Sequence, residues 1–119
     1  MASVDEQALS GSTNGRPIKI VATATAGTLL HTATAGSGAA ADHDRVYLYL
    51  HNNSAAAVDC TVEFGGVSAD DLTLVTIAAK AGPVLVVPGA PLQNSLEVRC
   101  FAASANVVMA TGYIHRVDK

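Results

Sequence analysis

The sequence predicts an all-β protein, an antiparallel β-sandwich or barrel of about eight strands. From residue 17 onward, short runs of β-branched residues are separated by clusters of Gly, Pro, Asn and Asp, a pattern typical of strands joined by turns. Several runs alternate apolar with polar residues, so that one face of each strand is buried and the other solvated. No long segment shows the 3.6-residue apolar period of a helix. Regularly spaced short strands favour a sandwich or barrel over βαβ units.

The chain divides into an arm and one domain. Residues 1–16 are rich in Ser, Gly, Asn and acidic residues and show no sustained apolar period, so they predict an extended N-terminal arm. Residues 17–119 form the sandwich domain, because 119 residues suit a single core. The expected strands are Pro17–Ala24, Thr28–Ala35, Arg45–Asn52, Val58–Phe64, Leu72–Ile77, Val84–Val87, Leu96–Ala102 and Val107–Val117.

The alternation also places the cysteines. Cys60 and Cys100 fall on the apolar faces of their strands, where a free cysteine behaves as a small buried hydrophobe. A disulfide between them is the alternative, which two cysteines without a secretory signal do not favour. The chain starts with acidic and polar residues instead of the basic and apolar regions of a signal peptide. We therefore expect synthesis in a cytoplasm and free thiols.

Low charge is the most unusual property of the composition. Only 14% of the residues are charged and half are hydrophobic, against about 25% charged residues in an ordinary soluble domain. A surface this poor in charge promotes association, so we expect partners to cover part of it. The net charge of -3 lacks the basic footprint of a nucleic-acid binder. No apolar run approaches the roughly 18 residues of a membrane span, so we expect neither nucleic acid nor membrane as a partner.

No constellation of residues predicts catalysis, a metal or a cofactor. Asp42-His43-Asp44 is the tightest cluster of ligand-type residues. Adjacent residues of a strand point to opposite faces, so at most the two carboxylates could share an ion, and a polar turn before Arg45 is the preferred interpretation. The histidines at 31, 43, 51 and 115 accompany no nucleophile motif. Asn52-Asn53-Ser54 fits a glycosylation sequon but is interpreted as a turn. We expect a protein that is not an enzyme.

Two kinds of residue are candidates for partner contacts. A Thr-Ala-Thr-Ala-Gly sequence occurs twice, at residues 23–27 and 32–36, and its small side chains would let another sheet approach closely. Tyrosine is an amphipathic residue that suits the rim or centre of an interface. The candidate contact residues are Arg16, Thr23, Thr25, Thr32, Thr34, Tyr47, Tyr49 and Tyr113.

The order of strands and turns resembles small virion proteins of tailed bacteriophages, the family that decorates or cements the capsid. The resemblance covers about residues 17–117 and is one of pattern. It is carried by Val62-Glu63-Phe64-Gly65-Gly66, Asp70-Asp71-Leu72, Leu85-Val86-Val87-Pro88-Gly89-Ala90-Pro91-Leu92, Asn94, Val98-Arg99, Phe101-Ala102, Ala105-Asn106-Val107 and Gly112-Tyr113.

The resemblance implies a jelly-roll-like sandwich that self-associates as a homodimer or homotrimer. It implies a place on the exterior of the virion capsid, where the protein clamps neighbouring copies of the major capsid protein and catalyses nothing. An eight-strand count agrees with a jelly roll. The alternatives are a sugar-binding or fibre- or tail-type β-sandwich of a virion, and an enzyme that rests only on the histidines and Asp42-His43-Asp44.

Overall fold

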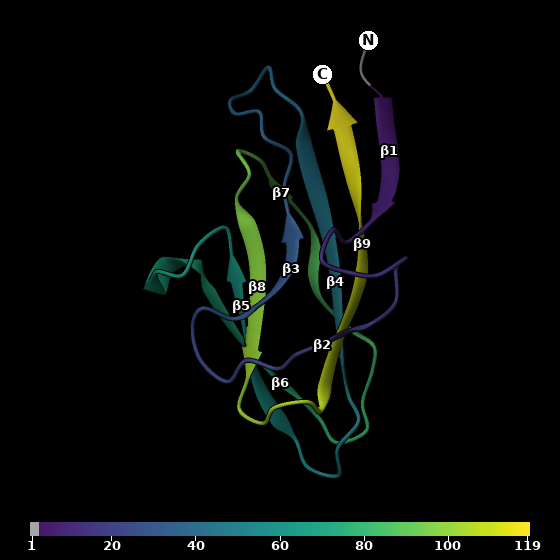
Figure 1. Ribbon diagram of the computed structural model, residues 1–119, viewed down its shortest axis with the longest axis vertical. Coiled ribbons are helices and arrows are strands. Elements are labelled where there is room, and N and C mark those ends of the chain that lie inside the picture. Colours follow the sequence, from purple (N-terminus) through teal and green to yellow (C-terminus); the bar gives the residue numbers. More distant parts are fainter. Residues whose placement is uncertain (1–2) are drawn as a thin grey trace.

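Two antiparallel sheets pack face to face and enclose one apolar core (Figure 1). The computed structural model describes residues 3–119. One short 3₁₀ helix, η1 (Ala69–Asp71), precedes β6. The strands are β1 (Ser3–Ala8), β2 (Ile18–Lys19), β3 (Thr28–Thr32), β4 (His43–Asn52), β5 (Val58–Phe64), β6 (Leu72–Ile77), β7 (Val84–Leu92), β8 (Glu97–Ala102) and β9 (Val108–Asp118).

The topology is that of a jelly roll. The first sheet has the order β1-β9-β4-β7, with the two-residue β2 also pairing with β9, and the second has the order β3-β8-β5-β6. If β2 is set aside, the first strand pairs with the last, the second with the second-last, and so on to the central hairpin of β5 and β6. The chain is thus a long hairpin rolled into two sheets, as in jelly-roll proteins. The predicted sandwich class is confirmed.

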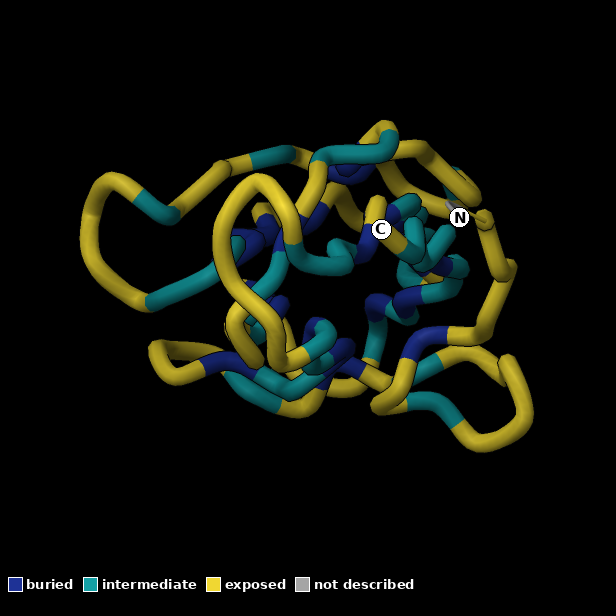
Figure 2. Tube along the Cα trace, turned by 90° about the horizontal axis from the view of Figure 1, so that it is seen from above, coloured by how far each residue is buried: buried dark blue, intermediate teal, exposed yellow. Residues whose placement is uncertain are grey.

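Alternating side chains build the core between the sheets. In β4, Val46, Leu48 and Leu50 have no solvent exposure, whereas the tyrosines between them are half-buried. β9 repeats the pattern beside β4, with Ile114 and Ala110 inside. Figure 2 shows the result from above, with buried segments between the two layers and exposed loops around them. Within residues 3–119, no helix is long and apolar enough to cross a membrane.

The expected strands at Val58–Phe64 and Leu72–Ile77 are found with those bounds. Within the predicted arm, residues 3–8 form β1, which adds to the edge of β9. Its residues are exposed on both faces, so no apolar alternation signals a strand. The predicted strand Val84–Val87 extends to Leu92, because an edge strand tolerates prolines that would break a central one.

The predicted strand Pro17–Ala24 is wrong beyond Lys19. The chain leaves the first sheet there, and residues 21–27 cross to the second sheet. The Thr28 hydroxyl accepts hydrogen bonds from the backbone N–H groups of Val21 and Ala22, both at 3.1 Å. These bonds satisfy backbone groups that a continued strand would have given to a neighbour. The second predicted Thr/Ala strand likewise ends early, at Thr32.

Candidate interaction surface

The three tyrosines of the chain converge on the outer face of the β1-β9-β4-β7 sheet. Tyr47 of β4 lies directly opposite Tyr113 of β9 in the register of the sheet. Their rings stack with centroids 4.8 Å apart and planes 16° from parallel. His115 lies on the same face of β9, with its ring 5.1 Å from Tyr47 and 5.3 Å from Tyr113. The two interactions of Tyr47 join residues 66 or more positions apart in the chain, which only the pairing of β4 with β9 brings together.

Neighbouring strands extend this aromatic cluster. On β7, Leu85 pairs with Tyr49 and Pro88 pairs with Tyr47, so both share the outer face. Gly89 has φ of 100°, and a Cβ there would lie 3.0 Å from the Tyr47 ring, so only glycine lets this ring lie against β7. We call the surface made by the outward side chains of β4, β7 and β9 the tyrosine face; its members are Tyr47, Tyr49, Tyr113, His115, Leu85 and Pro88.

The tyrosine face is mainly uncharged, and the exposed Arg45 of β4 lies at its margin, opposite His115. Desolvation and the neighbouring Tyr49 and Tyr47 hydroxyls raise the pKa of Tyr113, so its phenol stays protonated at neutral pH. At the edge of the face, Glu6 of β1 lies 3.1 Å from His115 Nε2. Half-buried, neutral aromatic side chains combine apolar area with polar ends, and such residues are enriched in protein interfaces.

The predicted threonine contacts lie elsewhere. Thr23 and Thr25 are exposed in the segment that crosses the second sheet, and Thr32 and Thr34 are half-buried at and after β3. Arg16 is exposed in the turn before β2. The structure therefore brings together the three predicted tyrosines and separates them from the threonines. His115 was not predicted as a contact, although its apolar-polar phase in the last strand is the same as that of Tyr113.

A buried polar cluster, His31, Asp44 and Arg116, joins the two sheets and was missed by the sequence analysis. Asp44 has no solvent exposure and accepts bonds from Arg116 Nε at 2.8 Å and Nη2 at 3.1 Å. His31 Nε2 lies 2.8 Å from the same carboxylate. Burial raises the pKa of Asp44, but the hydrogen bonds from Arg116 and His31 and the charge of Arg116 outweigh burial and hold this pKa below its ordinary value.

The hydrogen bonds of this cluster give it a structural role. The Ser10 backbone N–H donates to His31 Nδ1 at 3.0 Å, so Nδ1 carries no proton and Nε2 donates to Asp44. Both ring nitrogens are therefore engaged inside the protein, and neither is free to take a proton from a substrate. A general base needs an atom within reach of the proton that it removes. His31 holds the start of the chain and the two sheets together instead.

The predicted turn at Asp42-His43-Asp44 is wrong in part, because β4 begins at His43. Asp44 points inward to Arg116, and Asp42 accepts a hydrogen bond from the Lys119 backbone at 2.9 Å. The two carboxylates thus have different partners. Over residues 3–119 no group of three or more His, Cys, Asp and Glu side chains is placed to hold a metal ion.

The remaining predicted features are buried. Cys60 and Cys100 are free and lie in the core, as expected. Desolvation raises the pKa of the Cys60 thiol to about 11 and that of Cys100 to about 12, so both stay protonated. The Asn52 amide donates to the carbonyls of Ala56, Ile77 and Ala78. A buried amide with these bonds is no acceptor for a glycan, and residues 53–57 form the turn into β5.

Comparison with known proteins found no match to this chain. No protein-family model, no curated protein and no solved structure matches it. The evidence for a role of the tyrosine face is therefore its own geometry.

Proposed function

We propose that this protein is a structural component of a bacteriophage virion that decorates the outside of the capsid. It binds across neighbouring copies of the major capsid protein, stabilises their contacts, acts as a homo-oligomer and catalyses no reaction. The tyrosine face is the observation that carries the proposal. It collects every tyrosine of the chain on one open sheet surface.

The composition supports a surface that is covered by other proteins in the functional state. Only 14% of residues are charged, and a surface of this kind favours association over a free monomer. A protein that binds only the assembled shell stabilises the shell by mass action. The jelly-roll topology and the pattern resemblance over residues 17–117 support the same role.

Attachment can be tested on purified virions of the phage that carries this sequence. Mass spectrometry of the particles should find the chain, and imaging should show it on the capsid exterior. Particles that lack the chain would overturn the proposal. In reconstitution, Tyr47→Ser should reduce occupancy on undecorated capsids, whereas Thr23→Ser, a change in the segment that crosses the second sheet, should leave it unchanged.

The N-terminal strand offers a second test of attachment. Residues 3–8 are exposed and pair only with β9 among the described residues. Leu9 is buried, and Ser10 and Gly11 bond to the chain around β3. Removal of residues 1–8 should therefore leave the sandwich folded but weaken attachment. Full occupancy of capsids by the shortened chain would contradict a role of this segment in binding.

A sugar-binding virion module is the second candidate, favoured by the stacked rings of Tyr47 and Tyr113. Flat aromatic surfaces are suited to stack against the apolar faces of sugar rings. Binding to a glycan array that is lost in Tyr47→Ala and kept in Thr23→Ala would select this function. An array without binding, together with capsid attachment, would select decoration.

A further inference from the structure

The two sheets end in four edge strands, and three of them are protected against pairing with another chain. An unprotected edge presents unpaired N–H and C=O groups and is a template for a further strand. β1 and β7 are the edges of the first sheet, and β3 and β6 are the edges of the second. Each protected edge uses a different device.

Two of these edges are closed by backbone chemistry. β7 carries Pro88 and Pro91, which lack N–H donors, and its register with β4 shifts twice. β3 is covered by the chain before it, because the Gly11 N–H donates to the Leu30 carbonyl at 2.9 Å and the Ser10 hydroxyl accepts from the Thr32 N–H at 2.8 Å. Neither strand offers a continuous row of free groups.

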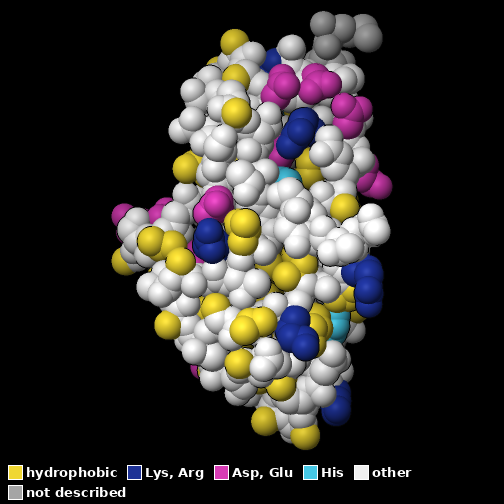
Figure 3. Space-filling view, viewed as in Figure 1, with side chains coloured by type: hydrophobic (Ala, Val, Ile, Leu, Met, Phe, Trp, Pro, Cys, Tyr) yellow, Lys and Arg dark blue, Asp and Glu magenta, His cyan; other side chains and the backbone are white. Residues whose placement is uncertain are grey.

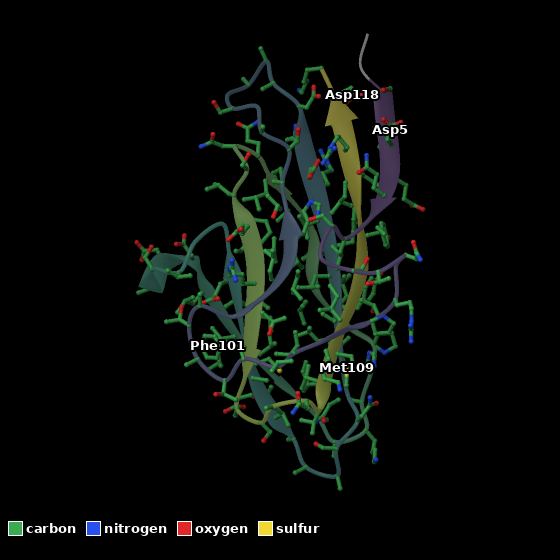
Figure 4. All side chains as sticks on the ribbon, viewed as in Figure 1. Asp5, Phe101, Met109 and Asp118 are labelled. Carbon is green, nitrogen blue, oxygen red and sulfur yellow. The ribbon has the colours of Figure 1, made fainter. Side chains whose placement is uncertain are left out.

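Charge protects the third edge. β1 contains Asp5 and Glu6, and Asp118 lies beside it at the end of β9 (Figure 4). Figure 3 shows acidic side chains gathered at the upper end of the molecule in this view. A second copy of β1 placed against this edge would bring carboxylates together, and like charges in close cross-strand pairs are destabilising.

β6 has none of these devices. Its sequence, Leu-Thr-Leu-Val-Thr-Ile, has no charge and no proline, and its register with β5 has no shift. Leu74 is 68% exposed and Leu72 is 38% exposed, both on the outer face of the sheet. Within residues 3–119, the backbone of residues 73–76 hydrogen-bonds only to β5.

A hollow lies beside the same edge. It has a volume of about 320 Å³ and lies between β5, β6 and β7. The hollow is lined by Thr73, Val86 and the buried Val62 and Val87, among other residues. Thr73 points toward the interior side of its sheet yet is exposed. The sandwich is therefore open on the side where β6 is unpaired.

We propose that β6 pairs antiparallel with β6 of a second copy of this chain, so that two four-stranded sheets join into one across a two-fold axis. A two-fold contact is isologous, so each surface must complement itself. β6 meets this condition, because it has no charged side chain that would repel the same side chain of β6 in the second copy. The apolar side chains of Leu72 and Leu74 then lie against those of the other copy, where cross-strand apolar pairs stabilise the sheet.

The inference deepens the self-association in the proposed function and selects a dimer over a trimer, because two edges satisfy each other. It leaves the tyrosine face free for a different partner. Six-residue strands give a small interface, and small interfaces have modest affinity. The association should therefore be measured at micromolar concentrations with the full chain.

The test is the native mass of the full chain and of four variants, with no capsid present, so that its failure is distinct from failure of the decoration proposal. The native protein should have about twice its monomer mass of 12.1 kDa. Leu74→Lys and Thr73→Pro should both give monomers with unchanged circular dichroism. Val4→Lys, at an equally exposed position on β1, should leave the dimer intact.

Several results would overturn the inference. They are a native protein that is monomeric at these concentrations, a trimer, or a dimer that persists in Leu74→Lys. A dimer that is lost in Tyr47→Lys but not in Leu74→Lys would place the second copy on the tyrosine face instead. If Thr73→Pro does not fold, hydrogen exchange on the native chain decides, since the amides of β6 that point away from β5 should be protected in concentrated samples and exchange in dilute ones.

Discussion

Asp44 and Glu63 are both fully buried acids, yet they are satisfied in opposite ways. Asp44 lies between the sheets and has a cationic partner in Arg116 at 2.8 Å. Glu63 lies on the outer face of the second sheet, where it accepts hydrogen bonds from the Thr25 hydroxyl and, at 2.6 Å, from the Gly27 N–H. Its donors are neutral and belong to a loop.

The difference explains why the two outer faces of the sandwich are unlike. Glu63 holds the segment 21–27 across the second sheet, and Arg99 adds a bond to the Gly27 carbonyl at 2.9 Å. The chain thus covers part of this face itself. Asp44 bonds His31 of β3 and Arg116 of β9 between the two sheets. It therefore attaches no segment to the outer face of the first sheet. The Tyr47, Tyr49 and Tyr113 side chains on this face are only half-buried.

Removal of the cation should have the largest effect. Arg116→Met leaves the Asp44 carboxylate buried without its charged partner, and we expect a loss of about 3 kcal/mol in the free energy of unfolding, as for broken buried ion pairs. Urea denaturation measures this loss. Arg45→Met, an exposed arginine on the neighbouring strand, should change stability by less than about 0.5 kcal/mol.

Removal of the acid on the second sheet should cost less. Glu63→Ala leaves the Gly27 N–H without its acceptor, and an unsatisfied buried donor costs about 1–3 kcal/mol. The segment 21–27 should also detach and become sensitive to proteases while the sandwich stays folded. Glu97→Ala is the control, because the Glu97 carboxylate is part-exposed and bonds only Arg99 among the described residues. Equal cleavage of both variants would contradict the role given to Glu63.

Acid should weaken the stabilising contribution of Asp44. The pKa of Asp44 is lowered in the folded protein, so its stabilising contribution is present above the unfolded value of about 3.9. This contribution is lost as the pH falls through the lower folded pKa. The stability difference between the native protein and Asp44→Asn should therefore shrink below about pH 4. A difference that stays constant between pH 6 and pH 2 would refute the ion pair as its source.

The smallest effect on stability is expected at the tyrosine face. Tyr47→Ser removes the stacked contact with Tyr113, and such aromatic pairs contribute about 0.5–1.5 kcal/mol. Thermal unfolding should show a correspondingly small decrease. A loss as large as that of Arg116→Met would mean that the face serves the stability of the monomer rather than its contacts.

Local pattern was sufficient for much of the fold. Strict alternation identified β5, and a short run with β-branched residues bounded by turn residues identified β6, both with their observed ends; alternation also put Cys60 and Cys100 inside. It failed for β1, whose residues are exposed on both faces. It also failed for residues 21–24, in the segment that leaves the first sheet and is bonded by the Thr28 hydroxyl and the Glu63 carboxylate. Alternation of apolar and polar residues indicates a strand with one buried face, so it cannot identify a strand that buries neither face.

The sequence by itself determined the class of the fold, the faces of the central strands and the low charge of the chain, because these depend on composition and on neighbours along the chain. Tertiary structure alone decided which residues meet. Tyr47 reaches Tyr113, and His31 reaches Asp44 and Arg116, only through strand pairings between distant parts of the chain. Whether a strand such as β6 lies at an edge is likewise set by the order of strands in the sheet, since that order follows from how the whole hairpin rolls up.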